Sequence, residues 1–272
     1  MPAIKKKQRF FTLCMWILAL LMIYPFIMMV VLSFRPQGLV YKGLLYPIKP
    51  IASNFLTVLT NEYFGSWYLN TIVTVVLTIV LRLIVTLPAS YALSRLRFPG
   101  QRVLILFFLA TYMVPAETTM VPRYLYFKNI GLLDSLWSIV LPEMTEILYL
   151  VLLMEFFRAI PKDFSEAGYI DGASHRQILT KIFIPLAGPS LATVILFSFI
   201  NIWNNFLDPY LFITTTSRQL ITPALKYFQE RGGANIPVQM AGANLAIIPV
   251  IILFTFTQKY FVAGVSSSGI KG

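Results

Sequence analysis

The sequence is poor in the residues that most enzymes and metal sites depend on. It has one cysteine, Cys14, and one histidine, His175, so it can form neither an intrachain disulfide nor a metal site with several such ligands. It also lacks a G-x-x-x-x-G-K-[ST] segment, the loop whose backbone cradles nucleotide phosphates. No set of nucleophile, base and orienting residue can be assembled from what remains. Catalysis by this chain and a cofactor of its own are therefore not expected.

Charged residues are scarce as well, and hydrophobic residues take their place. Of the 272 residues, 12% are charged and 57% are hydrophobic, which is the composition of a membrane protein and not of a soluble domain. Cys14 lies inside an apolar run, where a small buried side chain is expected. The sequence therefore predicts an all-α integral membrane protein whose helices cross the bilayer.

Six apolar stretches are each long enough to span the hydrocarbon as a helix. The first follows a basic N-terminal segment, but it is longer than the core of a signal peptide and no A-x-A site comes after it, so an uncleaved span is predicted. Together the stretches predict one transmembrane domain over 1–272, built as a six-span helix bundle. The predicted spans cover about 11–34, 66–93, 103–121, 135–157, 186–208 and 241–258.

The positive charges are shared unevenly among the segments that connect these spans. Thirteen Lys and Arg fall among the 57 residues of 1–10, 94–102, 158–181 and 259–272. Eight fall among the 76 residues of 35–65, 122–134 and 209–240. Because basic residues concentrate on the cytoplasmic side, the first group and both termini are predicted to be cytoplasmic. The net charge of +11 is thus assigned to topology and to contact with anionic lipid, not to nucleic-acid binding.

One cytoplasmic segment, 161–185, is charged and compact between two apolar runs. Asp163 with Glu166 predicts a capping box that opens a helix over 164–171, and Gly172 stands where a left-handed stop is needed. Ser174 with Gln177 predicts a second capped helix. The apolar face expected on that helix consists of Ile178, Leu179, Ile182 and Phe183. Two short helices joined at a glycine predict a knob, to which Ala167, Gly168 and Ala173 would lend a thin profile.

This segment resembles the cytoplasmic EAA loop in permease subunits of bacterial ABC importers. The pattern of that loop is E-A-A, three residues, G, nine residues and I-x-L-P. Here Glu166, Ala167 and Gly168 are followed at the same spacing by Gly172, Ile182, Ile184 and Pro185. Gly168 replaces the third alanine and Ile184 replaces the leucine.

The resemblance extends to other stretches and points to the carbohydrate-uptake branch of these permeases, near the smaller partner of the maltose permease pair. They are YALSRLRFPGQR (91–102), IDGAS (170–174), NIWNNFLDPY (201–210) and QKYFVAG…KG (258–272). The resemblance implies a sugar substrate, a bacterial inner-membrane location, a second permease subunit, an ATPase dimer that binds the ATP, and an extracytoplasmic solute-binding protein. The residues implied for coupling to the ATPase are Glu166, Ala167, Gly168, Asp171, Gly172, Ala173 and Ser174.

Polar residues inside the predicted spans are costly in lipid and therefore informative. A helix over 186–208 would place one group of them on a narrow arc, away from Trp203 and Phe206. That arc would consist of Asn201, Asn204, Asn205 and Asp208. They are interpreted either as a wall of the substrate path or as hydrogen-bonding groups between helices. In the family a W-N-D motif is usual here, and Asn205 stands where Asp is common.

Arg82 is the only charged residue in the predicted span 66–93. It needs a partner, because a lone arginine in the hydrocarbon costs about 2.5–3.5 kcal/mol on insertion scales. Glu143 and Glu146 lie in the span 135–157, and Glu146 is expected at a depth similar to that of Arg82. An intramembrane ion pair between Arg82 and Glu146 is predicted, with a substrate contact as the alternative.

Alternatives of other classes are a stand-alone secondary transporter or channel and a membrane-embedded enzyme or assembly factor, for which no reactive set of residues is found. Within the importer class, a permease for a solute other than sugar is the alternative. The segment 209–240 is expected to be a long, irregular outer connection that contacts the binding protein. Its contact groups would be Tyr210, Tyr227, Phe228, Gln229, Glu230 and Arg231, with a flexible point at Gly232 and Gly233.

The missing phosphate loop leads to a direct prediction. The purified chain alone should not hydrolyse ATP, since nothing in it can hold the nucleotide phosphates. The measurement is phosphate release by the isolated chain beside the same chain assembled with its ATPase. Turnover by the isolated chain at the rate of the assembled transporter would contradict the prediction.

Overall fold

The computed structural model is helical, and the residues that it describes contain no β-strand. The backbone is described for residues 2–40, 50–230 and 235–268, and the side chains for 9–40, 50–229 and 235–257. The side chains of the N-terminal lysines, of Glu230 and of the C-terminal motif 258–272, and the residues Arg231, Gly232 and Gly233, lie outside these ranges.

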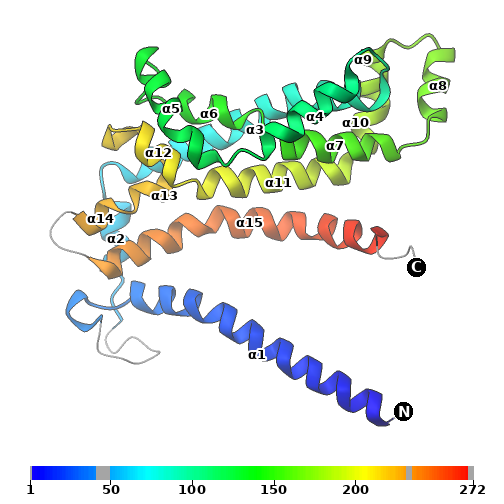
Figure 1. Ribbon diagram of the computed structural model, residues 1–272. Helices are drawn as coiled ribbons and strands as arrows, with labels where there is room; N and C mark the ends of the chain where they lie inside the picture. Colours follow the sequence, from blue (N-terminus) through cyan, green and yellow to red (C-terminus); the bar gives the residue numbers. More distant parts are fainter. Residues whose placement is uncertain (1, 41–49, 231–234, 269–272) are drawn as a thin grey trace. The chain divides into compact units, whose positions relative to one another are not determined.

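Beyond α2 the helices follow one another with short connections, many of them at a proline or glycine (Figure 1). They are α1 Pro2–Ser33, α2 Ser53–Leu59, α3 Phe64–Arg95, α4 Gln101–Tyr112, α5 Ala116–Asn129, α6 Trp137–Glu143, α7 Ile147–Ala159, α8 Asp163–Ile170, α9 His175–Ile178, α10 Ile184–Leu186, α11 Gly188–Asn204, α12 Leu207–Phe212, α13 Ile221–Ala224, α14 Tyr227–Glu230 and α15 Ile236–Ser268. A π-helical turn, Leu179–Phe183, joins α9 to α10, and 3₁₀ turns occur at Gln37–Leu39 and Thr216–Arg218.

The chain divides into two compact units, which are described separately. The first comprises Met1–Gly65 and Ala224–Ile248, and the second comprises Ser66–Pro223 and Pro249–Gly272. In the first unit, the Asn54 side chain donates to the carbonyls of Ser33 and Arg35 at 2.8 and 2.9 Å and so closes the end of α1. Cys14 on α1 is exposed, so the expectation that it is buried is wrong for this chain.

Three helices are long and apolar enough to cross a membrane, over Arg9–Ser33, Phe64–Arg95 and Ile236–Thr257. Two bent pairs pass the same test together: α4 with α5, which meet at 91°, and His175–Leu186 with α11, which meet at 80°. The described residues thus contain three to five candidate spans. The predicted single helix over 103–121 is wrong, because Pro115 cannot donate a hydrogen bond to Thr111 and the chain turns there.

Two other predicted spans are interrupted. The span 135–157 consists of α6 and α7, with a break between Glu143 and Ile147. The span 186–208 ends as a helix at Asn204, since Asn205 is extended with ψ 114° and α12 begins only at Leu207. Pro209 accounts for this second break, because it has no N–H to donate to the carbonyl of Asn205 and its ring would collide with it.

The second unit is held together where α3, α7 and α11 pack side by side (Figure 1). Tyr149 and Leu153 of α7 and Val194 of α11 are almost fully buried there, and Leu83 and Leu87 of α3 pack against them. Removing this much apolar surface from contact with water or lipid fixes the three helices against one another. The short helices α8 to α10 lie at one end of the packed helices, and α5, α6 and α12 lie toward the other end.

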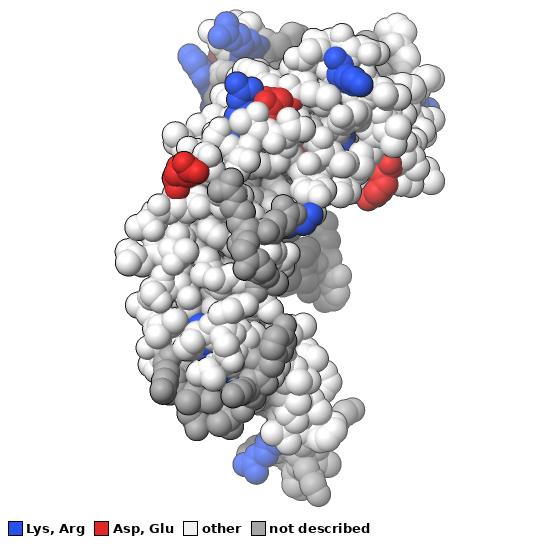
Figure 2. All heavy atoms as spheres, turned by 90° about the vertical axis from the view of Figure 1, so that its left-hand side faces the viewer, with Lys and Arg blue, Asp and Glu red and all other residues white. Residues whose placement is uncertain are grey.

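Much of the surface of the described residues is apolar. Many large hydrophobic side chains on α1, α3, α4 and α15 are exposed, which suits helices that face lipid or another subunit. On the face shown in Figure 2, charged side chains stand singly or in small groups on a mostly uncharged surface.

Candidate functional site

The segment 161–185 folds into two short helices linked by a tight glycine turn. Gly172 has φ +73°, a conformation that side chains disfavour. Its N–H donates to the carbonyl of Tyr169 at 3.0 Å, and the N–H of Ala173 donates to that of Gly168 at 2.9 Å. This pair of bonds is the Schellman arrangement, which terminates a helix and satisfies its last carbonyls. The predicted stop at Gly172 is therefore confirmed.

Of the two capping boxes predicted from the sequence, one is present. At the start of α9, Ser174 Oγ accepts from the N–H of Gln177 at 3.3 Å, and Gln177 Oε1 accepts from the N–H of Ser174 at 2.8 Å. The box expected at Asp163 is wrong, because α8 already includes Asp163 and its N-cap, Lys162, makes no side-chain cap. Asp163 and Glu166 instead lie in the first helical turn, where negative charge is favoured by the helix dipole.

The two faces of this helix pair differ. Ile178 and Phe183 are fully buried against Tyr91 of α3 and Phe157 of α7. Gly168 is also buried, and a Cβ on it would lie only 3.1 Å from Ile178 Cγ1. Its small size therefore serves packing inside the segment and not the predicted thin outer profile. On the outer side the apolar Ile170 is 86% exposed.

The coupling residues named from the sequence mostly lie on this outer side. Ala173 is half-buried, while the exposed ones are Glu166, Ala167, Asp171, Gly172 and Ser174. We call these exposed residues the rim of 161–185. The base of the segment consists of the residues buried against α3 and α7, such as Ile178 and Phe183.

Arg95, the last residue of α3, fastens this base. Its Nη2 donates to the carbonyls of Phe157 and Ile160, where α7 ends, and its guanidinium lies 4.9 Å from the centre of the Phe183 ring. One side chain therefore joins the ends of α3 and α7 to the helical segment that follows Gly172.

Arg82 lies fully buried at the centre of the second unit, with partners from three helices. Its Nη2 lies 3.1 Å from Glu143 Oε2 and 3.4 Å from Glu146 Oε2. Its Nη1 donates to Ser198 Oγ of α11 at 2.6 Å, and the Tyr149 ring lies 4.5 Å from its guanidinium carbon. The structure thus brings together the two residues of the predicted ion pair and adds Glu143 as a second carboxylate.

The same arginine supports the broken helix of α6 and α7. Its Nε donates to the backbone carbonyl of Glu143 at 2.9 Å, and its Nη2 donates to that carbonyl as well. That carbonyl lies where α6 ends, so it has lost its helical partner. In the hydrocarbon an unpaired carbonyl costs several kcal/mol, and interrupted backbone is tolerated only where protein satisfies it.

The four polar residues of 186–208 do not form the single arc that was predicted, because the helix ends at Asn204. Asn201 and Asn204 are exposed on one face of α11, while Trp203 is buried, with 2% exposure. Asn205 Oδ1 instead accepts from the N–H of Asp208 at 3.3 Å. Phe206, expected on the face of Trp203, is 42% exposed beyond the break.

Asp208 is held by a residue that sequence analysis had left aside. Arg123 Nη2 of α5 lies 2.6 Å from Asp208 Oδ1, and its guanidinium lies 5.0 Å from the centre of the Phe212 ring. Asp208 is 7% exposed, so its carboxylate binds α5 to α12 and is not offered to a solute in this conformation. The only signal for this ion pair in the sequence is that Arg123 and Asp208 both lie near the ends of predicted spans.

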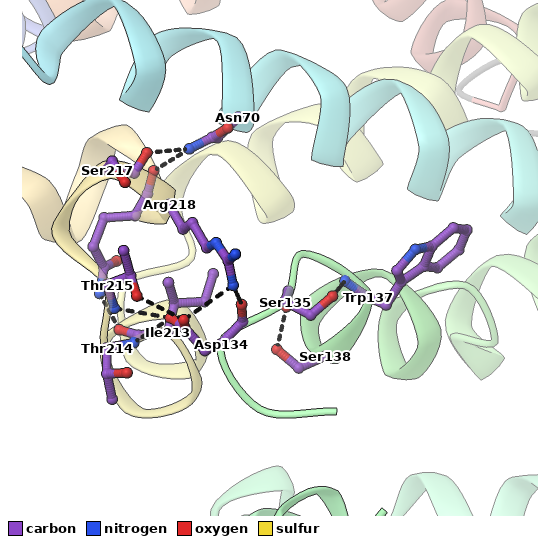
Figure 3. A network of polar contacts seen from close by, with 11 residues as sticks. Asn70, Asp134, Ser135, Trp137, Ser138, Ile213, Thr214, Thr215, Ser217 and Arg218 are labelled. Carbon is purple, nitrogen blue, oxygen red and sulfur yellow. Dashed lines mark hydrogen bonds and ion pairs between the residues drawn. The ribbon is translucent and has the colours of Figure 1, made fainter. Parts of the chain in front are cut away.

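Asp134 organises the connection between α12 and α13 (Figure 3). Its Oδ1 accepts from the N–H groups of Thr214 and Thr215 at 3.1 and 2.8 Å, and its Oδ2 accepts from Thr215 Oγ1 at 2.6 Å. Arg218 Nη1 donates to its Oδ2 at 3.1 Å and to its carbonyl at 2.8 Å. Burial alone would raise the pKa of the Asp134 carboxyl, but the bonds from Thr215 and Thr214 and the charge of Arg218 hold it below its ordinary value.

This network stays intact at neutral pH. A carboxyl whose pKa is lowered by folding stabilises the fold above its unfolded pKa, ~3.9 for Asp, and loses that contribution as the pH falls through the folded value. On the opposite side of the turn, Asn70 of α3 donates to the carbonyls of Ser217 and Gln219 at 2.9 and 3.2 Å. The connection between α12 and α13 is therefore held by hydrogen bonds from two sides, with Asp134 on one side and Asn70 of α3 on the other.

The expectation of an irregular connection over 209–240 is wrong where the structure describes it. Short helices α13 and α14 lie within it, and it also includes most of α12 and the start of α15. Tyr227 contacts Tyr63 edge to face at 6.1 Å, Phe228 is 7% exposed, and Gln229 Nε2 donates to Gln239 Oε1 at 2.7 Å, all inside the first unit. Of the expected contact groups, Tyr210 is 43% exposed.

The Arg82 cluster yields a prediction about stability. Arg82→Met should destabilise the folded chain by about 3–5 kcal/mol, because two carboxylates and a carbonyl lose their partner. Thermal unfolding of the purified assembly measures this. The control is Arg158→Met, whose exposed pair with Glu155 at 2.7 Å should be worth at most about 1 kcal/mol.

Adding Glu143→Gln and Glu146→Gln to Arg82→Met should restore part of the loss, since no unpaired charge then remains. Equal effects of Arg82→Met and Arg158→Met would show that the cluster is not a structural centre.

Residues 84–267 match the family described as "Binding-protein-dependent transport system inner membrane component". The chain is 30% identical to the putative ABC transporter permease protein ORF2 of Caldicellulosiruptor sp. over 98% of both chains. It is 33% identical to the trehalose transport system permease protein SugB of Mycobacterium tuberculosis over 89% of both. A solved structure of a bacterial ABC transporter involved in the import of the acidic polysaccharide alginate contains a chain with 30% identity and a TM-score of 0.85, covering 94% of this chain and 97% of that one. The chain therefore belongs to the binding-protein-dependent transport system inner membrane components.

Proposed function

We propose that this chain is the permease subunit of an ATP-driven importer for an oligosaccharide, and that it couples to a separate ATPase through 161–185. The observation that carries the proposal is the helix pair α8–α9, whose rim is exposed while its base is packed on α3 and α7. The sugar is inferred from the relatives, which are described as acting on trehalose and alginate.

The proposed topology has six spans with both termini in the cytoplasm. Five are the candidate spans of the structure, counting each bent pair once. The sixth is α6 with α7, whose break at Glu143 has Arg82 as a hydrogen-bond donor, so that its backbone meets the requirements of the hydrocarbon. The higher density of Lys and Arg in 1–10, 94–102, 158–181 and 259–272 supports the cytoplasmic side for these segments.

The proposed partners are a dimer of ATPase subunits, a second permease subunit and an extracytoplasmic solute-binding protein. The description of the family supports the binding protein. The exposed apolar side chains of the chain support a second subunit, which would cover some of them together with membrane lipid. The nucleotide is assigned to the ATPase, because this sequence has no phosphate loop.

In the proposed mechanism, nucleotide-driven closure of the ATPase moves α8 and α9. The shift passes to the spans because Ile178 and Phe183 are buried against α3 and α7, while Arg95 joins the ends of those helices. For the solute path to reorient, the closed ATPase must bind one arrangement of the spans more tightly than the other. The ATPase would contact the exposed rim of 161–185, and the difference in its affinity for the two arrangements of the spans would arise at this contact.

Asn201 and Asn204 are proposed to line the solute path. Both are exposed on α11 of the isolated chain, where amide groups would be costly against lipid. Amides donate and accept hydrogen bonds, as recognition of sugar hydroxyls requires. The sequence analysis also included Asp208 and Asn205 in the path. Asp208 forms an ion pair with Arg123, and its N–H donates to Asn205, so we propose a structural role for both residues.

A substitution at Gly172 tests whether 161–185 couples this chain to the ATPase. Gly172→Val should abolish most solute uptake while the chain still inserts, because a side chain at φ +73° costs about 1–2 kcal/mol or more and shifts α9. Uptake per inserted chain, with membrane level from immunoblots, is the measurement. Gly172→Asn is the matched control, since asparagine tolerates this conformation, and it should retain most uptake.

Glu166→Lys should lower uptake in the same assay by reversing the charge that α8 presents, whereas binding of the solute-binding protein should be unaffected. Normal uptake by both Gly172→Val and Glu166→Lys would disprove the coupling role of this segment.

Cysteine labelling tests the path. In a Cys14→Ser background, single cysteines at 201 and 204 should react with a small polar thiol reagent in the assembled transporter, and one at the buried position 203 should not. Ile84→Cys is the control for a lipid-facing position, because Ile84 is 61% exposed among apolar neighbours on α3. If positions 201 and 204 react no faster than position 84, the two asparagines do not face water.

A further inference from the structure

A pocket of about 420 Å³ lies between the end of α3, the α3–α4 turn and α8. The groups that decide its chemistry are Arg95, Arg97, Lys162, Ser165 and Glu166. It lies beside the exposed rim of 161–185 and shares Glu166 with it. Neither the solute path nor the packing of α8 accounts for its polar lining.

Two polar atoms of this lining are buried without a partner among the described residues: Ser165 Oγ and Arg95 Nε. Ser165 is 8% exposed, so bulk water does not solvate its hydroxyl. Native proteins leave few such groups unpaired, because each costs about 1–3 kcal/mol. Both are hydrogen-bond donors, but the Arg95 guanidinium is already held by the carbonyls of Phe157 and Ile160, so Ser165 Oγ is the donor that an oxygen-rich ligand in the pocket would satisfy.

The charge of the lining indicates the sign of that ligand. The lining includes three basic residues, Arg95, Arg97 and Lys162, and one acidic residue, Glu166. Within the described part of the chain, neither Arg97 nor Lys162 forms an ion pair. The pocket therefore attracts an anion, while Glu166 opposes a second negative charge and favours a singly charged one. A phosphate group matches these features, since it accepts several hydrogen bonds from guanidinium, ammonium and hydroxyl donors.

We propose that this pocket binds a phosphate group, supplied by the headgroup of an anionic phospholipid or by free inorganic phosphate. The lipid source rests on the proposed topology, in which α3 ends at the cytoplasmic interface, where basic pockets between spans hold anionic headgroups. Phosphate recognition itself does not depend on which solute is transported. A bound phosphate would bridge Arg97 of the turn and Ser165 of α8, and would thereby set the position of the coupling segment.

The test uses the complete transporter in phosphatidylcholine nanodiscs with and without phosphatidylglycerol. Native mass spectrometry measures the phosphatidylglycerol retained per assembly, and equilibrium binding of radiolabelled inorganic phosphate is measured in phosphatidylcholine alone. Arg97→Gln should lower retention about fivefold, the share expected of one basic residue. Ser165→Ala should also lower it, without reducing thermal stability, because it removes a hydroxyl that has no partner in the protein.

Arg102→Gln is the matched control, since Arg102 is an exposed arginine five residues after Arg97 that does not line the pocket. Retained phosphatidylglycerol that depends on Arg97 and Ser165 supports the lipid source. Binding of inorganic phosphate with the same dependence, without retained lipid, supports the free anion. Binding of neither, unchanged binding in Arg97→Gln or Ser165→Ala, or an equal loss in Arg102→Gln overturns the proposal. Phosphate binding is measured separately from solute uptake. A loss of uptake would leave phosphate binding intact, so failure of the proposed transport function can be told apart from failure of the phosphate proposal.

Discussion

Hydrogen bonds from side chains of α3 to backbone carbonyls at helix ends and turns hold the second unit together. Arg82 donates to the carbonyl of Glu143, where α6 ends. Arg95 donates to Phe157 and Ile160, where α7 ends. Trp67 donates to Thr216 at 2.6 Å in the connection that follows α12. One long helix thus supplies donors at three helix ends or turns, and at the break after Glu143, inside a proposed span, its donor meets the requirement that hydrocarbon imposes on interrupted backbone.

The breaks have consequences for function, because they place polar groups where a continuous helix would place apolar packing. The break after Glu143 brings two carboxylates to one guanidinium, and the break after Asn204 separates the exposed asparagines of α11 from the paired Asp208. The same helix α3 also reaches the coupling segment through Tyr91 and Arg95. A displacement of that segment therefore acts directly on the helix that holds the interrupted spans, through contacts and not through a flexible linker.

The two ends of the second unit are built differently. At the coupling end the contacts are mainly apolar, with Phe183 packed edge to face on Tyr91 and Phe157 at 5.2 and 5.4 Å. At the other end a single carboxylate, that of Asp134, accepts four hydrogen bonds from the connection between α12 and α13. Asp134 itself has φ 59°, a conformation that aspartate tolerates better than most residues. Apolar packing would suit the proposed movement of 161–185 as a body, whereas directed hydrogen bonds hold a turn in one conformation.

The sequence by itself determined the class of protein, the family and the local design of the segment 161–185. Composition and hydropathy act through the solvent and not through tertiary contacts, and the stop at Gly172 and the cap at Ser174 involve only neighbours in the chain. Pro115 and Pro209 mark two of the breaks in the sequence, but tertiary structure alone decided that Arg82 supports the break after Glu143, that Glu143 joins Glu146 at Arg82, that Arg123 holds Asp208, and that Gly168 faces inward. A break in lipid depends on a donor from another helix, and sequence periodicity, which assumes a continuous helix, contains no information on whether that donor is present.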